Sequence, residues 1–283
     1  MNIYPTTLSS KLLTAAMLAI GLFHVSNQFL LPPRSRINVH PATQVVIPSP
    51  VQTIMYAGDR YLAANLETIR VASVGTSEER ILAEYRVRAY SLISELNPCH
   101  EDNYYLANAM LAWGGSVKEA NNILEDATKC RRWDYMPPFF LSFNRYFFYR
   151  DLDGAIQAMN MAAERSDENR SIFERSAIVM AAEQFNDEEI AVEYLRNERD
   201  NAKDPKLAQG IDRRLQRLEG LLILRKAKIR YEKEIGRPLD TPEDLLSSGI
   251  LETYPQDPAN VGYELFNGEF RLRAINIGGI EIR

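Results

Sequence analysis

A layout of residues that recurs every 35 or 36 positions in the middle of the chain most constrains its fold. Each unit has a small residue followed four positions later by a larger apolar one, and a polar or glycine-containing turn stands before it. These pairs are Ala120 and Leu124, Ala155 and Met159, and Ala191 and Leu195. A spacing of four places both members on one helical face, so each unit predicts a helix that packs closely on a preceding helix.

The composition narrows the class of protein. The chain has 283 residues, of which 46% are apolar, and this is enough to bury a core. Its net charge of −5 gives no chain-wide attraction to nucleic acid, so we expect no nucleic-acid partner. The negative mean hydropathy excludes a multi-pass membrane protein but leaves room for a single span.

A single apolar segment at residues 12–31 follows a short tail at 1–11. As a helix, about 20 residues cover about 30 Å, which matches the hydrocarbon core of a bilayer. Polar residues in its second half leave a cleaved secretory signal open, whereas the lack of a small-x-small site after Phe23 favours an uncleaved anchor. We therefore expect a single-pass inner-membrane protein with its C-terminal part in the periplasm, held by a proline-rich linker at 32–53.

Helix–turn–helix units are predicted over residues 54–203. The first pair lies within 54–96, and we expect Met55, Leu62, Leu66 and Ile69 to form its packed apolar face. The spacing of about 34 residues, with small residues where paired helices cross, resembles the tetratricopeptide repeat. This resemblance implies a right-handed α-solenoid with a concave groove that binds a protein or peptide.

The helix that Pro137-Pro138 begins is unusually rich in aromatic rings. We expect Phe139, Phe143 and Tyr146 on its packed face, with the rings of a neighbouring face in the groove. By the register of the family, the groove would also receive residues from the helices before and after it. The predicted partner-binding residues are Tyr105, Ala109, Phe140, Asn144, Phe147 and Met180. Exposed rings are frequent anchors of protein interfaces, but burial of these rings by a neighbouring helix or by the C-terminal residues remains the alternative.

The two cysteines are relevant to the cellular compartment in which the chain folds. Cys99 precedes the first helix of one unit and Cys130 ends its second helix. These ends lie side by side in an antiparallel pair, so the thiols could form a disulfide in an oxidising compartment. Two buried free thiols are the alternative, and a zinc site with His100 lacks a fourth ligand.

The C-terminal part is predicted as one long helix at 204–235 and a small module with a β-hairpin at 236–283. Asp204-Pro205 begins the helix and Gly236 ends it, while Asn267-Gly268 is a strong hairpin turn. The order of Gly-Arg-Pro, a short helix, Pro-x-Asp-Pro around Asp257 and the hairpin resembles the tail of type II secretion pseudopilins. The anchor lies far upstream of this module, so pilin-like polymerisation is not implied.

No set of residues in the sequence predicts catalysis. A phosphate-binding glycine loop, a nucleophile with its base, and a cluster of metal ligands are all missing, so we expect no enzyme, cofactor or metal. The sequence thus predicts a mainly α, membrane-anchored scaffold or adaptor that binds a protein or peptide segment in an envelope assembly, such as secretion, pilus or surface-polymer machinery. The alternative is a structural subunit buried in an obligate membrane complex. Self-association is left open.

Overall fold

The computed structural model describes residues 15–23, 25, 45–73, 80–273, 275–277 and 280–282. Residues 15–23 are helical, and their large apolar side chains are exposed. No helix in this described part is both long and apolar enough to cross a bilayer. Much of the expected anchor at 12–31, and the linker up to residue 44, lies outside the described residues.

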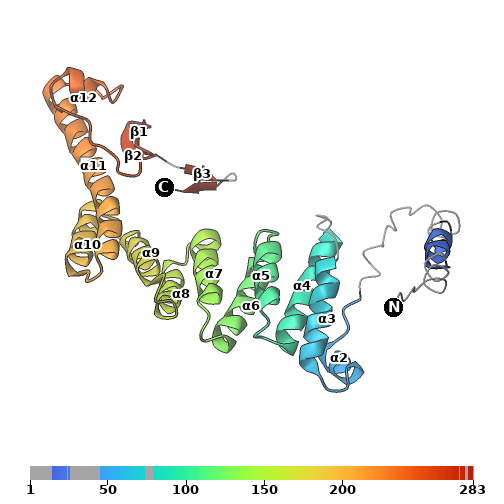
Figure 1. The fold of residues 1–283 in the computed structure, drawn as a ribbon. Coiled ribbons are helices and arrows are strands. Elements are labelled where there is room, and N and C mark those ends of the chain that lie inside the picture. The colour runs from blue at the N-terminus through green and yellow to red at the C-terminus, as the bar shows by residue number, and fades with distance from the viewer. Residues whose placement is uncertain are drawn as a thin grey trace, which may run out of the picture.

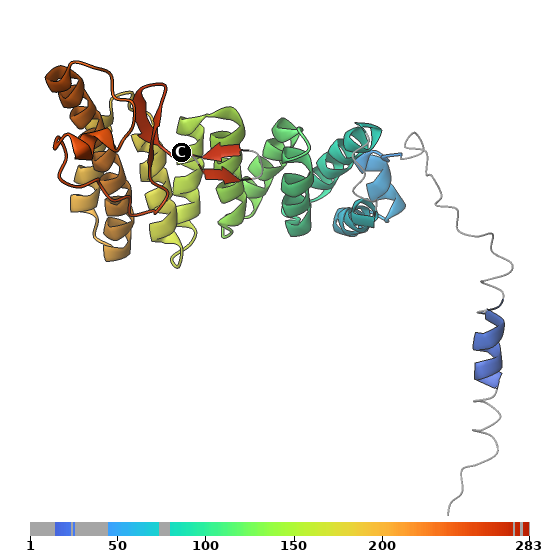
Figure 2. The same ribbon diagram turned by 90° about the horizontal axis from the view of Figure 1, so that it is seen from above.

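The described chain is mainly helical, and its helices stand side by side in an elongated row (Figure 1). The first part of the row contains α2 (Ser49–Met55), α3 (Arg60–Ser73) and α4 (Arg80–Leu96). The next units are α5 (Glu101–Ala107) continued by the π-helical turn η2 (Asn108–Ala112), α6 (Val117–Cys130), α7 (Met136–Asn144) continued by η3 (Arg145–Tyr149), and α8 (Leu152–Glu164). The last helices are α9 (Arg170–Ala182), α10 (Glu188–Asn201), α11 (Pro205–Ile235) and the short α12 (Asp244–Ser247). Each helix packs mainly on its neighbours in the sequence, as the view from above also shows (Figure 2).

The small residues of the repeating layout lie where the helices meet. Ala120 and Ala155 are fully buried and Ala191 is nearly so, which lets α6, α8 and α10 approach the helices before them. The larger residues four positions later, Leu124 and Leu195, are buried on the same face. The prediction of packed helix pairs is therefore confirmed for these units.

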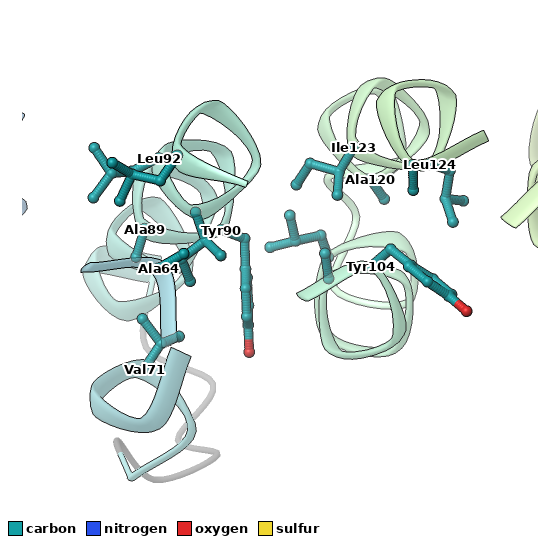
Figure 3. Packing of buried hydrophobic residues seen from close by; sticks show 14 of the residues in the cluster. Ala64, Val71, Ala89, Tyr90, Leu92, Tyr104, Ala120, Ile123 and Leu124 are labelled. Carbon is teal, nitrogen blue, oxygen red and sulfur yellow. The ribbon is translucent and has the colours of Figure 1, made fainter. Parts of the chain in front are cut away.

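Burial divides the row into two large apolar clusters and a small one between them. The first cluster extends from Ala63 to Ala158, and Figure 3 shows Tyr90 reaching from α4 into the space before the α5–α6 pair. The second extends from Ala182 to Leu272 and combines α9, α10 and α11 with the C-terminal module. The third contains Met159, Ala162, Ala163, Phe173 and Ala177 and lies between α8 and α9.

The long helix and the hairpin behind it form as the sequence predicts. The Asp204 side chain accepts a hydrogen bond from the Lys206 N–H at the start of α11, and Gly236 ends it with a φ of 76°. Strands β1 (Tyr263–Phe266) and β2 (Glu269–Leu272) pair antiparallel around Asn267-Gly268. A second antiparallel pair, β3 (Ile275–Ile277) with β4 (Ile280–Ile282), was not predicted.

Hydrogen bonds fix the C-terminal module on α11. Asp257 accepts bonds from the backbone N–H groups of Ala259, Val261 and Gly262, and its carboxylate lies 3.2 Å from Arg217 of α11. The Tyr263 hydroxyl donates to the Arg217 carbonyl at 3.1 Å. A Cβ at position 220 would overlap this hydroxyl, so glycine is needed where the tyrosine meets the helix. Asp257 thus organises a loop, and the structure assigns it this structural role.

The predicted packed face of α3 is wrong. Leu62, Leu66 and Ile69 are 43%, 40% and 66% exposed, and Met55 of α2 is 59% exposed. The face that packs on α4 instead carries smaller or polar side chains, and its buried members are Ala63, Ala64, Glu67, Thr68 and Val71. Small residues allow a closer helix contact, so the larger side chains are left on the outer side of the row.

Candidate partner-binding face

A series of aromatic rings connects the first helices of three successive units. Tyr104 and Tyr105 of α5 stack at 4.7 Å between ring centroids, and Tyr105 meets Phe140 of α7 edge-on at 5.4 Å. Phe139 continues from Phe140 at 5.7 Å and reaches Phe173 of α9 at 5.5 Å. The repeating units therefore bring rings far apart in the sequence into one continuous series.

The members of this series are only partly withdrawn from solvent. Tyr104 and Phe173 are buried, whereas Tyr105, Phe139 and Phe140 are half-buried. Tyr105 and Phe140 also pack against the first apolar cluster. Each of these two predicted site residues thus uses one side of its ring for the core and leaves another side at the surface.

A second group of rings lies at the C-terminal ends of the same helices. Trp113, which follows η2, contacts Phe147 at 5.7 Å, Phe148 at 5.5 Å and Phe143 at 6.3 Å. The indole of Trp113 is 57% exposed, and Phe147 is half-buried. We call Trp113, Phe143, Phe147 and Phe148 the tryptophan cluster. The sequence predicted Phe147 in the site but did not select Trp113.

A cavity of about 340 Å³ opens beside the tryptophan cluster. Its lining residues are Ala83, Arg86, Ala109, Met110, Leu111, Trp113, Gly114 and Ser116. The predicted site residue Ala109 is exposed and forms part of this wall. The space is sufficient for one large side chain of a partner, and most of its lining is apolar.

The prediction that Asn144 faces the groove is wrong. Its side chain is fully buried, and its amide nitrogen donates to the side-chain oxygens of Asn108 and Asn121, both at 2.9 Å. These two asparagines satisfy the amide nitrogen, which would otherwise cost free energy to bury, while the Asn144 side-chain oxygen has no hydrogen-bond partner among the described residues. Asn108 and Asn144 are 36 residues apart and hold the same position in successive units. The recurrence of asparagine at this position could therefore have predicted a contact between units.

The other expected packing on α7 and η3 also differs from the structure. Phe139, Phe143 and Tyr146 are half-buried, whereas Leu141 and Ser142 are buried. The Ser142 hydroxyl donates to the Ala155 carbonyl of α8 at 2.7 Å. Leu141 and Ser142 are smaller than the aromatic residues of this helix and allow α8 to approach closely. The aromatic rings consequently lie nearer the surface.

Met180 is related to the series of rings only through the apolar cluster that contains Phe173. It is half-buried and packs against the small apolar cluster between α8 and α9. The site predicted from the sequence is therefore assembled in part: Tyr105 and Phe140 touch each other, Phe147 and Ala109 belong to the region of the tryptophan cluster, and Met180 contacts neither group in the described interactions.

Cys99 and Cys130 form a disulfide, with their Cα atoms 5.3 Å apart. Arg131 beside it donates to the Cys99 carbonyl and to the carboxylates of Glu101 and Asp134. Burial acts to raise the pKa of Asp134, but hydrogen bonds from the Met136 N–H, the Tyr104 hydroxyl and Arg131 hold that pKa below its usual value. The end of the α5–α6 pair is thus fixed by one covalent bond and a charged network.

The described residues show no group of three or more His, Cys, Asp and Glu side chains that could hold a metal ion. The arrangement offers apolar contact through rings. In comparisons with known proteins, no family model, no curated protein and no solved structure matches this chain.

Proposed function

We propose that the chain is a membrane-anchored, extracytoplasmic scaffold or adaptor of the tetratricopeptide-like type that binds a protein or peptide segment of an envelope assembly. This proposal rests on the series of aromatic rings across α5, α7 and α9, which we call the ring surface, and on the tryptophan cluster, whose indole is exposed. Aromatic side chains at a partly exposed surface contribute strongly to protein interfaces. A secretion, pilus or surface-polymer machine would supply such a partner.

Two further features support the cellular setting of the proposal. The disulfide between Cys99 and Cys130 suits an oxidising compartment such as the periplasm. The apolar segment at 12–31 has the length of a single span, and its described part is helical. These features support inner-membrane anchoring with the helical row in the periplasm.

The test is site-specific crosslinking in native membranes with the full chain. Replacing Trp113 and Phe147 by alanine removes the exposed indole and one half-buried ring of the tryptophan cluster. Trp133→Ala serves as the matched control because Trp133 is 68% exposed but lies outside that cluster. We expect one crosslinked product to be lost with Trp113→Ala/Phe147→Ala and retained with Trp133→Ala, while both variants keep the wild-type circular dichroism and elution volume.

Equal crosslinking by all three proteins would contradict the adaptor function. Loss of solubility in the tryptophan-cluster variant, with no soluble monomer recovered, would instead support a structural subunit of an obligate membrane complex. The two results are distinguished by size-exclusion chromatography of the variant after mild extraction.

A further inference from the structure

One apolar surface of the row has no partner in the described part of the chain. It runs over the outer sides of α2 and α3, and we call it the α2–α3 face. Its members are Val51, Ile54, Met55, Tyr61, Leu62, Leu66 and Ile69, which are between 40% and 78% exposed. Seven exposed apolar side chains on two helices that pack together exceed the scattered single residues of an ordinary surface, and such groups mark interaction surfaces.

The two ends of the row differ in how they are covered. At the C-terminal end, α11 packs on α9 and α10 and carries the hairpin β1–β2 (Figure 1). At the other end, α3 packs on α4 with its inner side and also contacts α2, and among the described residues no further helix covers its outer side. A row of stacked helices needs a polar end to remain soluble in isolation, and the α2–α3 face does not provide one.

The α2–α3 face follows the apolar segment closely in the sequence, and this favours the bilayer as the surface that covers it. The apolar segment ends near residue 31, and α2 begins at Ser49, so the α2–α3 end of the row follows the segment most closely. The 23 residues between Val25 and Ser49 span at most about 80 Å. An anchored chain therefore keeps this end next to the bilayer at a high effective concentration, while a soluble partner would have to diffuse to it.

The charges near the face are compatible with a lipid surface. Residues 45–73 contain two acidic and two basic side chains, although the whole chain has a net charge of −5. Both carboxylates have internal partners: Asp59 accepts from the Tyr61 and Leu62 N–H groups, and buried Glu67 pairs with Arg70. Arg60 lies over the ring of Tyr61 at 5.6 Å, and a tyrosine beside a cation suits the headgroup region.

We propose that the α2–α3 face rests on the bilayer and inserts its apolar side chains into the boundary between headgroups and acyl chains. This inference rests on the membrane anchor of the proposed function. Two contacts, the anchor and this face, would fix the direction in which the row leaves the membrane. The ring surface and the tryptophan cluster would then be presented to a partner at a defined height above the lipid.

The experiment uses the full chain in vesicles of phosphatidylcholine and phosphatidylglycerol, with a polarity-sensitive fluorophore on a single introduced cysteine. The positions are Leu66→Cys on the face, Leu18→Cys in the apolar segment, and Asn122→Cys on the exposed side of α6 as the control. Lipids with a doxyl quencher on the acyl chain report direct contact. We expect blue-shifted, lipid-quenched emission at positions 18 and 66, and neither effect at position 122.

A charged variant provides the second measurement. Ile54→Asp/Ile69→Asp places two carboxylates on the face, and both positions are exposed, so folding is retained. We expect lipid quenching at position 66 to fall in this variant. It should persist in the matched variant Ile190→Asp/Ile223→Asp, which charges exposed isoleucines elsewhere.

The remaining outcomes separate this inference from the proposed function. Quenching at position 18 with water-like emission at position 66 overturns the bilayer contact and leaves the anchor intact. A blue shift at position 66 without lipid quenching also overturns it, since a protein surface such as a second copy then covers the face. A lack of quenching at position 18 alone refutes the anchor, whereas a lack of quenching at both positions refutes the anchor and the bilayer contact together.

Discussion

At the scale of single residues, buried polar side chains determine how successive units fit together. Asn144 is the central member of three buried asparagines, because its side-chain amide donates to both Asn108 and Asn121. We predict that Asn144→Ala lowers the free energy of unfolding by about 2–4 kcal/mol, since two nearly buried acceptors lose their donor and a cavity forms. Urea unfolding measures this change, and Asn122→Ala on the exposed side of α6 should change it by less than about 0.5 kcal/mol.

A double-mutant cycle separates the amide contact from the cavity. The cost of Asn144→Ala should shrink in a chain that already carries Asn108→Ala, because one of the two contacts is then missing. Strict additivity of the two substitutions would show that the residues do not interact.

We predict that His100 makes the stability of the chain depend on pH. Its Nδ1 accepts a hydrogen bond from the Asn103 N–H at the start of α5, and its Nε2 lies 3.3 Å from the Thr68 hydroxyl of α3. Burial lowers the pKa of His100 below its ordinary value of 6.5. The unfolded chain consequently binds a proton at a higher pH than the folded one, and stability falls as the pH drops from about 6.5 towards the folded pKa.

We predict that His100→Asn keeps the helix cap and removes this pH dependence. Asparagine is a good N-cap residue and does not titrate. The free energy of unfolding of the two proteins should be compared between pH 7.5 and pH 5. The same slope in both proteins would mean that another group is responsible.

At the scale of elements, the ends of helices and strands were easier to predict than the face of each helix that is buried. Pro205 and Gly236 limit α11, and the Asn267-Gly268 turn limits β1 and β2, because each of these residues restricts or permits backbone angles locally. The faces of α3 and α7 depend on which neighbour can approach most closely. On both helices the smaller side chains face inwards, so a search for the largest apolar residues selected the wrong face.

The same limit applies to the candidate site. Tyr105 and Phe140 could be selected because they are 35 residues apart in successive units, and Phe147 because its spacing of seven from Phe140 places both on one helical face. The structure places all three at least partly at the surface. Trp113 could not, because its exposure follows from the turn at Gly114-Gly115 and from the positions of the rings on the next unit. Which rings remain accessible depends on packing between units, and local periodicity does not contain that information.

The disulfide stabilises the α5–α6 element through the length of the loop it closes. Cys99 and Cys130 are 31 residues apart, and a crosslink of this span lowers the entropy of the unfolded chain by an amount worth about 3–4 kcal/mol. We predict that Cys99→Ser/Cys130→Ser loses stability of this order in urea unfolding under oxidising conditions. Reductant should destabilise the wild type to a similar level and leave the variant unchanged. An identical midpoint for the wild type with and without reductant would contradict the prediction.

At the scale of the whole molecule, the two large apolar clusters are joined through a small one. The linking cluster between α8 and α9 has three alanines among its five buried members, so it buries little apolar surface compared with its neighbours. In a row of units that touch mainly their neighbours, stability is the sum of local terms and contacts between adjacent units. Each large apolar cluster can therefore open separately, because the core residues of one do not belong to the core of the other.

We predict that core substitutions act mainly on their own half. Leu215 of α11 and Leu124 of α6 are both fully buried, one in each large cluster, and replacing either by alanine costs about 2–5 kcal/mol locally. In native-state hydrogen exchange, Leu215→Ala should speed exchange in α10 and α11 and leave the amides of α4 and α6 protected, whereas Leu124→Ala should do the reverse. Equal loss of protection along the entire row in both variants would show one cooperative unit, because the α8–α9 contact would then transmit the full cost of either cavity.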